Sequence, residues 1–325
     1  MSRRQVVVIL SFFGREDTLR CVESLVSGSP SARLLVIDNG SFDGVIEAVQ
    51  ARWPNVDTIQ TKSNLGFAGG MNVGLRWALF VGADTITVLN NDTIIPAGVI
   101  DALAETALRR GAAVSPEVRY ADGEGRVWFG GGTVDPETNL PRHLSDKEIA
   151  DRYGHPVERH AREELAIRVV QTLAGCCITA PAVTWRQVGL FDERYFLNFE
   201  DSDWSIRAGS AGVSLLVDPR AVIHHRVSAS FTGAYGYLST YYYTRNGLLF
   251  GRSRRNGGLL SAVRFLRRHV LPDILGALRS GHRREAARRA SIVLLAVGAH
   301  CGRRYGRAPH SVEALSARWA RRPAG

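Results

Sequence analysis

The chain has 325 residues, of which 45% are hydrophobic and 22% are charged, as in an ordinary soluble globular protein. The apolar run at residues 290–299 is far shorter than the roughly 20 residues that span a bilayer, which argues against a membrane-spanning segment. The net charge of +10 is unevenly distributed, because residues 245–325 contain 18 Arg and carry +15, which leaves −5 for residues 1–244. We therefore expect a mildly acidic body followed by a strongly basic extension.

The N-terminal residues and the cysteines favour a reducing compartment. The apolar run at residues 6–10 is too short for a signal peptide and reads as a strand. The four cysteines show no metal-ligand spacing, and the adjacent pair Cys176-Cys177 lies in an apolar run, as small buried hydrophobes do. We expect a cytoplasmic protein.

The first third of the chain alternates between strand and helix patterns. Strands are predicted at residues 5–10, 34–37, 56–60 and 86–89, and helices at 17–26, 45–53, 71–80 and 96–110. This order predicts an α/β fold with a mostly parallel sheet flanked by helices on both faces. Ligands of such sheets bind beyond the carboxyl ends of the strands, and two of these ends carry Asp38-Asn39 and Asn90-Asn91-Asp92.

The pattern changes after residue 115. Residues 120–135 are rich in glycine and aromatic residues, as in a hairpin, and residues 137–164 are polar and read as a mobile insertion near the site, or lid. Order returns at 169–179, with helices at 181–188 and 201–211 and strands at 213–217 and 221–223. From residue 237 onward the pattern is helical and rich in arginine.

Three turns carry candidate chemistry. The carboxylate of Asp38 could accept from a pyrimidine imide N–H, although Asp-Asn-Gly is equally an Asx-turn that closes a strand. The loop at 64–72 contains glycines that allow close approach to phosphate oxygens, or it is simply a strand-to-helix loop. Asp92 could hold a divalent cation together with diphosphate oxygens, or cap the next helix.

The stretch at residues 189–207 places five carboxylates among aromatic side chains. Burial of such acids is costly unless they pair, bind a cation or handle protons. Helix capping explains one acid of Glu200-Asp-Ser-Asp203, but not Glu200 and Asp201 side by side. Of the pair His224-His225, at least one is expected to be an exposed residue, and either could complete a metal site.

The order of these pieces resembles the family 2 glycosyltransferases, inverting enzymes of the GT-A fold, and in particular their bacterial rhamnosyltransferase-like branch. The resemblance covers about residues 5–250 and rests on several motifs. They are Val36-Ile-Asp-Asn-Gly-Ser-Phe-Asp-Gly44, Asn64-Leu-Gly-Phe-Ala-Gly-Gly-Met-Asn72, Leu89-Asn-Asn-Asp92, Gly189-Leu-Phe-Asp-Glu-Arg-Tyr-Phe196, Glu200-Asp-Ser-Asp-Trp-Ser-Ile-Arg207, Pro219-Arg-Ala-Val-Ile-His224 and Tyr241-Tyr-Tyr-Thr-Arg-Asn246. It implies a GT-A catalytic domain at residues 1–240, with a donor half at about 1–115 and an acceptor half at about 116–240, and a helical extension at 241–325.

The resemblance also implies roles for single residues. Asp201 matches the catalytic base, with Glu200 beside it; Asp92 matches the last acid of the metal-binding Asp-x-Asp, and His224 a histidine that some members place on the metal. The nucleotide-sugar site it implies contains Ser11, Phe13, Asp38, Asn39, Asp43, Asn64, Gly66, Gly69, Asn72, Asn90 and Asn91.

Two positions depart from the family pattern. Asn90 stands where the first Asp of Asp-x-Asp would be, which weakens the expected metal site. Ser11-Phe-Phe-Gly14 replaces an Asn-aromatic-Asn-Gly pattern, so that Phe13 removes an amide from the edge of the nucleotide pocket and leaves the choice of base open.

The expected function is the inverting transfer of a sugar, with rhamnose from dTDP-rhamnose as the leading candidate, in cell-surface glycan assembly. The donor is a dTDP- or UDP-sugar, the cofactor Mg²⁺ or Mn²⁺, and the acceptor a glycan, a lipid-linked molecule or a small molecule. Asp201 would take the proton of the acceptor hydroxyl as that oxygen attacks the anomeric carbon. The alternatives are tailoring of a secondary metabolite and a catalytically idle sugar-nucleotide-binding scaffold; a homodimer is left open.

The basic extension has three interpretations. Aromatic residues among its arginines are few after Phe265, so nucleic acid is not an expected partner. A solvated arginine-rich helix is the simplest interpretation. Contact with an anionic membrane surface, at the inner face of the plasma membrane, is slightly favoured, because apolar residues lie alongside Arg264, Arg267 and Arg268; they are Leu259, Leu260, Val263, Phe265, Leu266 and Val270.

Overall fold

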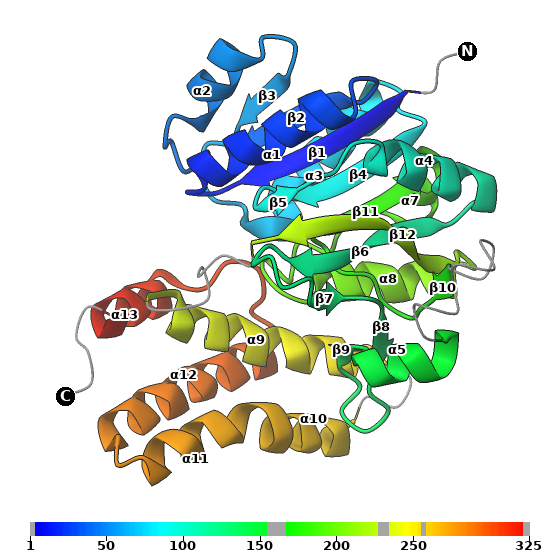
Figure 1. Cartoon of the computed structure of the whole chain (residues 1–325). Coiled ribbons are helices and arrows are strands. Elements are labelled where there is room, and N and C mark those ends of the chain that lie inside the picture. Colours follow the sequence, from blue (N-terminus) through cyan, green and yellow to red (C-terminus); the bar gives the residue numbers. More distant parts are fainter. Residues whose placement is uncertain (1–3, 155–166, 227–233, 255–257, 321–325) are drawn as a thin grey trace. The chain divides into compact units, whose positions relative to one another are not determined.

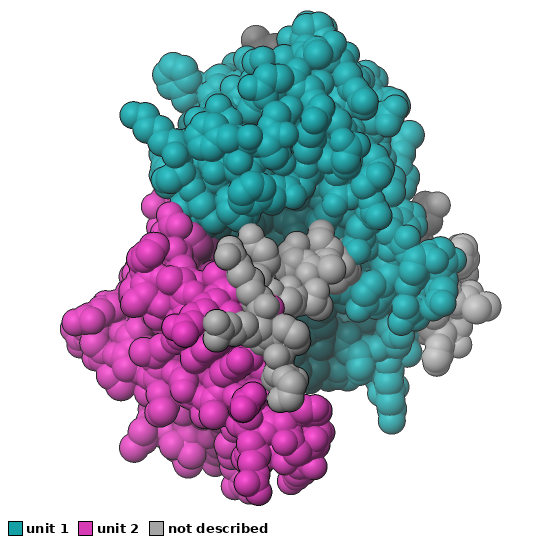
Figure 2. Space-filling view, turned by 90° about the vertical axis from the view of Figure 1, so that its left-hand side faces the viewer, with its two compact units in different colours: residues 1–133, 142–192, 200–227 teal, residues 134–141, 193–199, 228–325 magenta. Residues whose placement is uncertain are grey.

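The structure is a computed structural model that describes residues 4–154, 167–226, 234–254 and 258–320. The chain divides into two compact units (Figure 2). Unit 1 contains residues 1–133, 142–192 and 200–227, and unit 2 contains residues 134–141, 193–199 and 228–325. Two short segments, residues 134–141 and 193–199, therefore belong to unit 2 although the chain on either side of each belongs to unit 1.

Unit 1 is built on a sheet of ten strands among the described residues (Figure 1). The strands run in the order β10-β12-β6-β11-β4-β1-β2-β3, with β5 beside β12 and β7 beside β6. Their bounds are β1 Gln5–Ser11, β2 Arg33–Asp38, β3 Asp57–Gln60, β4 Thr85–Asn90, β5 Thr93–Ile94, β6 Ala113–Tyr120, β7 Val127–Phe129, β10 Arg168–Val169, β11 Cys177–Pro181 and β12 Leu215–His225. Strands β3, β2, β1 and β4 are mutually parallel, and so are β6 and β12, whereas β11 runs antiparallel between β4 and β6.

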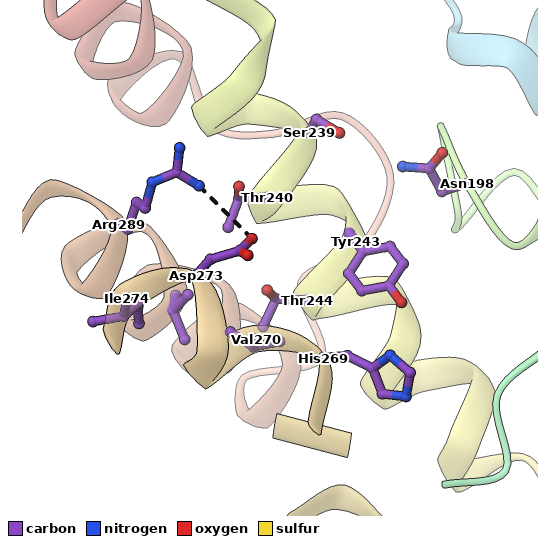
Figure 3. Close-up of a pocket in the computed structure, with 11 residues that line it drawn as sticks. Asn198, Ser239, Thr240, Tyr243, Thr244, His269, Val270, Asp273, Ile274 and Arg289 are labelled. Carbon is purple, nitrogen blue, oxygen red and sulfur yellow. Dashed lines mark ion pairs between the residues drawn. The ribbon is translucent and has the colours of Figure 1, made fainter. Parts of the chain in front are cut away.

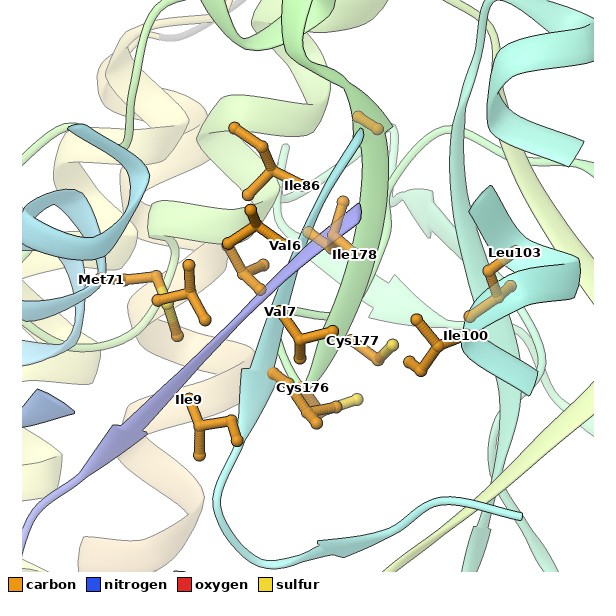
Figure 4. Packing of buried hydrophobic residues seen from close by; sticks show 14 of the residues in the cluster. Val6, Val7, Ile9, Met71, Ile86, Ile100, Leu103, Cys176, Cys177 and Ile178 are labelled. Carbon is orange, nitrogen blue, oxygen red and sulfur yellow. The ribbon is translucent and has the colours of Figure 1, made fainter. Parts of the chain in front are cut away.

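Helices cover both faces of this sheet. They are α1 Arg15–Gly28, α2 Val45–Arg52, α3 Gly66–Phe80, α4 Val99–Arg110, α7 Ala182–Val188 and α8 Glu200–Ser210, and unit 1 also contains α5 Asp146–Tyr153. Figure 4 shows Met71 of α3 on one side of strands β1, β4 and β11, and Ile100 and Leu103 of α4 on the other. Continuous β-branched runs such as Val6–Ile9 are wholly buried because both faces of their strands are covered. The predicted α/β fold is thus confirmed.

Several local features differ from the sequence-based expectations. Helix α3 begins at Gly66, five residues earlier than predicted, and the two strands predicted at 213–223 are one strand with a register shift between Asp218 and Val222. Within the predicted mobile insertion, α5 is a regular helix whose capping box joins Ser145 and Glu148. Residues 155–166 of that insertion lie outside the described residues, and a lid function stays a prediction.

Unit 2 is helical. Its helices are α9 Ala234–Arg252, α10 Leu259–Phe265, α11 Leu271–Arg279, α12 Arg283–Cys301 and α13 His310–Ala320, and a π-helical turn, η3, at Leu266–Val270 joins α10 to α11. Helix α9 contacts α12 and α13, and its aromatic residues Tyr237, Tyr241 and Tyr242 share a buried cluster with Ile292 of α12. The predicted domain boundary at residue 240 stays a prediction, although α9 runs without a break across that position.

Two polar residues of α9 organise unit 2. Asn246 Nδ2 donates to the carbonyl oxygens of Tyr195 (2.5 Å) and Leu197 (2.7 Å), and so holds the loop 193–199. Three residues of this loop, Phe196, Asn198 and Phe199, have positive φ angles of 58°, 69° and 76°, a conformation that costs free energy in non-glycine residues. The last four residues of the sequence Phe-Asp-Glu-Arg-Tyr-Phe belong to this loop. Asn246 is buried and therefore fixes a strained segment rather than facing solvent.

The second residue is Arg245, which is fully buried. Its guanidinium lies over the rings of Tyr241 and Tyr242 at 5.3 and 5.1 Å and donates to the carbonyl oxygen of Gly306 at 2.7 Å. The motif Tyr-Tyr-Tyr-Thr-Arg-Asn thus has a structural role in unit 2.

Across the residues that the structure describes, no helix combines the length and apolar character needed to cross a membrane.

Candidate active site

The ends of three neighbouring strands meet at one edge of the sheet of unit 1. Ser11 pairs with Asp38, the last residues of β1 and β2, and Leu10 pairs with Asn90, the last residue of β4. The antiparallel strand β11 begins at this edge, because the Asn90 N–H donates to the carbonyl oxygen of Cys176 at 2.9 Å. The residues that the sequence singled out at strand ends are therefore brought together, as expected for a parallel sheet.

Asp38 closes the turn after β2. Its Oδ1 accepts from the N–H and the hydroxyl of Ser41 at 2.9 and 2.5 Å, and its Oδ2 accepts from the Phe42 N–H at 2.9 Å and from Gln60 Nε2 at 2.8 Å. Burial raises the pKa of Asp38, but the hydrogen bonds from Ser41 and Gln60 outweigh it, so the pKa lies below its usual value. The carboxylate is charged and fixed as in an Asx-turn; recognition of a base by Asp38 stays a prediction.

Asn39 holds the glycine-rich loop that leads into α3. Its Oδ1 accepts from the Leu65 N–H, and its Nδ2 donates to the carbonyl oxygen of Gly66 at 3.0 Å and to Asn64 Oδ1 at 3.2 Å. Gly66 has a φ of +74°, which favours glycine, and its N–H donates to Asn64 Oδ1. Asn39, Asn64 and Gly66 thus form one network at the start of α3, where Gly69 is buried.

Four further predicted donor-site residues have different environments. Ser11 is buried and accepts from Thr18, whereas Phe13 is 64% exposed with a φ of +52°. Asp43 accepts from the Val45 N–H, and Asn91 Nδ2 donates to Thr18 Oγ1 at 2.9 Å. Direct contact of these residues with a nucleotide stays a prediction.

Asn72 makes long-range hydrogen bonds, and its contact with a nucleotide stays a prediction. Its side chain is buried, and it exchanges two hydrogen bonds with the backbone of Phe191, at 2.9 Å from Nδ2 to the carbonyl oxygen and 3.0 Å from the N–H to Oδ1. This reciprocal pair joins α3 to the segment that precedes the acid-rich stretch. Asn72 therefore anchors Phe191, a role that only the three-dimensional structure reveals.

The histidine beside Asp92 is His225 and not the predicted His224. His225 Nε2 lies 2.9 Å from Asp92 Oδ1, and both side chains are buried. Side chains alternate along β12, so His225 shares the buried face of Ile223, and His224 lies on the other face. The sequence could not decide between the two because the strand register was unknown.

The residues at the end of β4 fit a divalent cation shared with a diphosphate. Asn90 Oδ1 and His225 Nδ1 are buried without a hydrogen-bond partner among the described residues. Carboxylate, imidazole and amide oxygen are suitable ligands, and Mg²⁺ or Mn²⁺ needs few of them when phosphate oxygens complete the shell. The described residues contain no cluster of three or more His, Cys, Asp or Glu that would hold a metal by protein ligands alone.

Helix α8 begins with the acids that the sequence emphasised. Asp201 is half-buried, its Oδ2 accepts from the Gly175 N–H at 2.7 Å, and its Oδ1 accepts from the N–H of Ser202 at 2.6 Å. Asp203 instead pairs with Arg207 at 2.8 Å, and Arg207 donates to the carbonyl oxygens of Val188 and Leu190. The carboxylate of Asp201 is therefore oriented by backbone donors, whereas Asp203 fixes the preceding loop.

Glu200 has a different environment from its neighbour. It is buried, its Oε2 has no hydrogen-bond partner among the described residues, and Asp201 and Asp203 add negative charge nearby. Burial, as the largest cause, and the carboxylate of Asp201, as the next, raise the pKa of Glu200 to about 8. Glu200 is consequently protonated at neutral pH, and Asp201 has no charged carboxylate directly beside it.

Sequence reasoning missed three residues of this region. Gly175 was only part of an apolar run, yet its N–H orients Asp201. Trp128 lies edge-on to both His225 and His143, with ring centroids at 4.8 and 5.0 Å. His143 comes from the predicted insertion, and although part of its surface is exposed, desolvation lowers its pKa against the opposing effect of Asp201.

Comparison with known proteins gives consistent results. Residues 6–161 match the family described as Glycosyl transferase family 2. The chain is 30% identical over 285 residues to the N-acetylglucosaminyl-diphospho-decaprenol L-rhamnosyltransferase of Mycobacterium tuberculosis, which covers 81% of this chain and 89% of the relative.

Solved structures share the fold at low sequence identity. The mannosyltransferase PcManGT from Pyrobaculum calidifontis, in complex with GDP-Man and Mn²⁺, aligns with a TM-score of 0.56 and 15% identity over 97% of this chain and 85% of that chain. The S. aureus TarS 1-349 complex with UDP-GlcNAc aligns with a TM-score of 0.55 and 14% identity over 98% and 87%. At this identity the likeness concerns the GT-A fold.

Proposed function

The chain belongs to glycosyl transferase family 2, and from this we propose that it is a metal-dependent, inverting glycosyltransferase that uses a nucleoside-diphosphate sugar and a lipid-linked acceptor in glycan assembly. Rhamnose from dTDP-rhamnose is the leading donor, because the relative from Mycobacterium tuberculosis is named as a rhamnosyltransferase of a diphospho-decaprenol. That name also favours glycan assembly on a lipid over the tailoring of a small secondary metabolite. The idle-scaffold alternative loses its basis, because the family and the relative are transferases.

The observation that carries the mechanism is the orientation of Asp201 by Gly175. The carboxylate of Asp201 is half-buried. A charged acceptor of this kind suits the role of general base for a hydroxyl proton. Asp201 takes the proton as the acceptor oxygen forms its bond to the anomeric carbon, and the bond from that carbon to the diphosphate oxygen breaks on the opposite side. One displacement of this kind inverts the configuration and requires no nucleophile from the protein.

Glu200 supports the base without acting as one. Because its pKa is raised to about 8, it stays uncharged at neutral pH and does not oppose the negative charge on Asp201.

Asp92 and His225 would hold the metal ion, with Asn90 beside them. When bound, such an ion neutralises the leaving diphosphate. The donor-site turns at Asp38, Asn39 and Asn64 supply fixed backbone and amide groups for the nucleotide.

We also propose peripheral contact of α10 and η3 with an anionic membrane surface. Leu259, Leu260 and Val263 are 83%, 62% and 51% exposed, and the exposed arginines 264, 267 and 268 lie on the same short segment. Apolar side chains beside arginines suit the interface of an anionic bilayer, where a lipid-linked acceptor resides. A cytoplasmic location remains part of this proposal.

The decisive experiment compares Asp201→Asn with the wild type. Transfer from dTDP-rhamnose, and from UDP-sugars as alternatives, is measured with Mn²⁺ and a prenyl-diphosphate-linked N-acetylglucosamine acceptor, and donor binding is measured by calorimetry. We expect transfer to fall by at least about 10²-fold with donor affinity kept within about threefold.

The matched control is Asp57→Asn, the same change at a surface carboxylate of β3 that pairs with Arg33, and it should leave both values unchanged. Full activity of Asp201→Asn would refute the assignment, and absence of transfer from every donor by the wild type would refute the proposed function.

A further inference from the structure

A cavity of about 390 Å³ lies within unit 2, and the reaction proposed above makes no use of it. Its walls come from the last turns of α9 and α12, from α10 and from the start of η3. The wall is mostly apolar, and its side chains include Leu248, Ala262, Val263, Phe265, Leu266 and Val297. Its size falls at the lower end of the roughly 300–1,000 Å³ that is usual for small-molecule pockets.

The hydroxyl groups of this wall are already paired. The Ser261 hydroxyl donates to the carbonyl oxygen of Gly258 at 2.9 Å, and the Thr138 hydroxyl donates to Asp135 Oδ1 at 2.9 Å. Neither hydroxyl therefore needs a partner from a ligand. A wall of this composition favours an apolar occupant, which gains free energy by leaving water.

Two glycines of α9 shape the cavity. A Cβ atom at Gly247 would lie 2.6 Å from Cζ of Phe265, so this ring packs directly on the backbone of α9. At Gly251 the nearest atom to a Cβ would be the carbonyl oxygen of Thr138 at 3.8 Å, an ordinary contact distance. The cavity is therefore closed by the ring at Phe265, and the missing side chain at Gly251 leaves room beside the helix.

Arg252 supplies the charge of this wall. Its side chain is exposed, and no Asp or Glu is among the described residues that line the cavity. Burial and the charge of Arg252 lower the pKa of His300, which also lines the cavity, so His300 is uncharged at neutral pH. A positive charge beside an apolar cavity suits a ligand that has an apolar chain and an anionic head.

A second cavity of unit 2, of about 370 Å³, has different charges (Figure 3). Figure 3 marks the ion pair of Asp273 and Arg289, which are 3.7 Å apart, and Arg289 also pairs with Glu285 at 2.7 Å. An apolar chain in that cavity would displace water from charged groups without offering them a partner, which is unfavourable. The cavity beside α10 has no such pair among the described residues of its wall.

The apolar wall continues onto the exposed surface of α10. Leu259 and Val263 line the cavity and are also exposed, and both belong to the surface for which membrane contact is proposed above. A lipid chain that leaves a bilayer at this surface would pass over apolar side chains and enter the cavity without crossing open water.

We propose that this cavity holds the isoprene units nearest the phosphate in the prenyl chain of the acceptor lipid, and that Arg252 binds the phosphate. The identity of the lipid rests on the proposed function, which includes a lipid-linked acceptor. The apolar wall and the charge beside it belong to unit 2 alone, so binding can be measured without any sugar transfer.

Cys301 lines the cavity and provides the test. It is exposed, whereas Cys21, Cys176 and Cys177 are buried, so a maleimide should react first with Cys301 of the full chain. Saturating farnesyl phosphate, kept below its micelle concentration, should slow this reaction by at least about fivefold because the chain covers the thiol. Inorganic phosphate should not slow it, and geranyl phosphate, one isoprene unit shorter, should bind at least about threefold more weakly.

Two variants test the two parts of the site. Ala262→Phe fills the cavity and should abolish protection by farnesyl phosphate, whereas Ala287→Phe, the same change at an exposed position of α12, should not. Arg252→Gln should weaken binding of farnesyl phosphate by at least about threefold and leave binding of uncharged farnesol unchanged. Arg284→Gln, at an exposed position of α12, is its matched control. Melting temperatures show that each variant is folded.

A displaced cysteine shows whether protection is local. Ser291→Cys combined with Cys301→Ser places the thiol at an exposed position of α12 outside the cavity wall, where farnesyl phosphate should not protect it. The proposal is overturned if farnesyl phosphate does not protect Cys301, if it protects the displaced cysteine equally, or if Ala262→Phe is protected as the wild type is. Equal or better protection by dodecyl phosphate, which has a straight chain, would overturn the assignment to a prenyl chain.

The labelling experiment and the transfer assay fail separately. A wild type that transfers sugar to a prenyl-linked acceptor while its Cys301 is not protected would contradict this site and leave the proposed function intact. A wild type whose Cys301 is protected but which transfers no sugar from any donor would contradict the proposed function and leave the lipid site intact.

Discussion

The backbone N–H of Gly175 donates to Asp201 Oδ2 over 2.7 Å, across 26 residues of chain. A Cβ atom at Gly175 would lie 3.1 Å from the Cβ of Asp201 and 3.2 Å from Oδ2, closer than ordinary packing allows. The space that glycine leaves is therefore occupied by the carboxylate to which we assign proton abstraction. Position 175 tolerates no side chain without moving that carboxylate.

Gly175→Ala should lower the rate of sugar transfer by about tenfold or more, because the added methyl group displaces the base from its position. Donor affinity should change little. The matched control is Gly209→Ala, the same substitution on α8, where a Cβ would meet no atom within 4 Å and alanine favours the helix. Equal transfer rates in Gly175→Ala and the wild type would show that Asp201 does not need this position.

Glu200→Gln should change how stability depends on pH. The pKa of Glu200 is raised from 4.5 to about 8, so the folded state retains a proton that the unfolded state loses. The stability that this proton provides is fully present below about pH 4.5 and is lost as the pH rises to about 8. The free energy of unfolding of the wild type should therefore fall across this window relative to Glu200→Gln, by an amount on the order of a few kcal/mol.

Urea unfolding of both proteins at pH 5, 6.5 and 8 measures this difference. The pH profile of the free energy of unfolding of Glu200→Gln should lack the contribution of Glu200 and keep the contributions of all other titrating groups. Parallel pH profiles of the two proteins would mean that Glu200 titrates near its ordinary value.

His225→Ala should raise the Mn²⁺ concentration needed for half-maximal transfer by about tenfold or more, because His225 contacts Asp92 at 2.9 Å. His224→Ala is the matched control, since the side chain next in sequence lies on the other face of β12. Titration of Mn²⁺ in the transfer assay compares the two. A larger effect of His224→Ala would restore the sequence-based assignment.

Asn246→Ala should destabilise the protein by about 2–3 kcal/mol, because two backbone carbonyl groups of the strained loop 193–199 lose a buried donor. Denaturant unfolding measures the loss. Asn55→Ala, at an exposed position, provides the reference for the same substitution and should stay within about 0.5 kcal/mol of the wild type. A neutral result for Asn246→Ala would show that the loop holds its conformation without this side chain.

Replacement of Leu259 and Val263 by serine should reduce co-sedimentation of the full chain with anionic vesicles of phosphatidylglycerol and phosphatidylcholine by about fivefold. Leu294→Ser removes an equally exposed leucine, 71% exposed on α12, and should not reduce it. High salt should weaken binding because the arginines contribute. Vesicle binding that is equal in all three proteins would exclude α10 as the contact.

Residues that act through neighbours in sequence could be predicted well. The buried runs of β1, β2 and β4 and the polar turns after them lie as expected, because a buried parallel strand and the turn that closes it have local signatures. The capping box at Ser145 and Glu148 is also such a signature, and it would have revealed α5 within the predicted insertion.

Residues that act through distant partners could not. The hydrogen bonds of Asn72 with Phe191 span 119 residues, and that of Asn246 with Tyr195 spans 51. The choice between His224 and His225 depends on the register of β12 against β5, since one residue of slip exchanges the two faces. Gly175 has no signal of its own, because a glycine within an apolar run is consistent with many roles.

The reversed direction of β11 has a consequence for the order of folding. Strands β1 to β4 follow one another along the chain and can assemble as residues 1–90 collapse. Strand β11 joins them only when Thr179 meets Thr87, whose hydroxyl groups lie 2.7 Å apart after a separation of 92 residues. Gly175 lies two residues before β11, so we expect the base to be oriented only once this long-range pairing has formed, and its recovery to lag behind that of the donor turns during refolding.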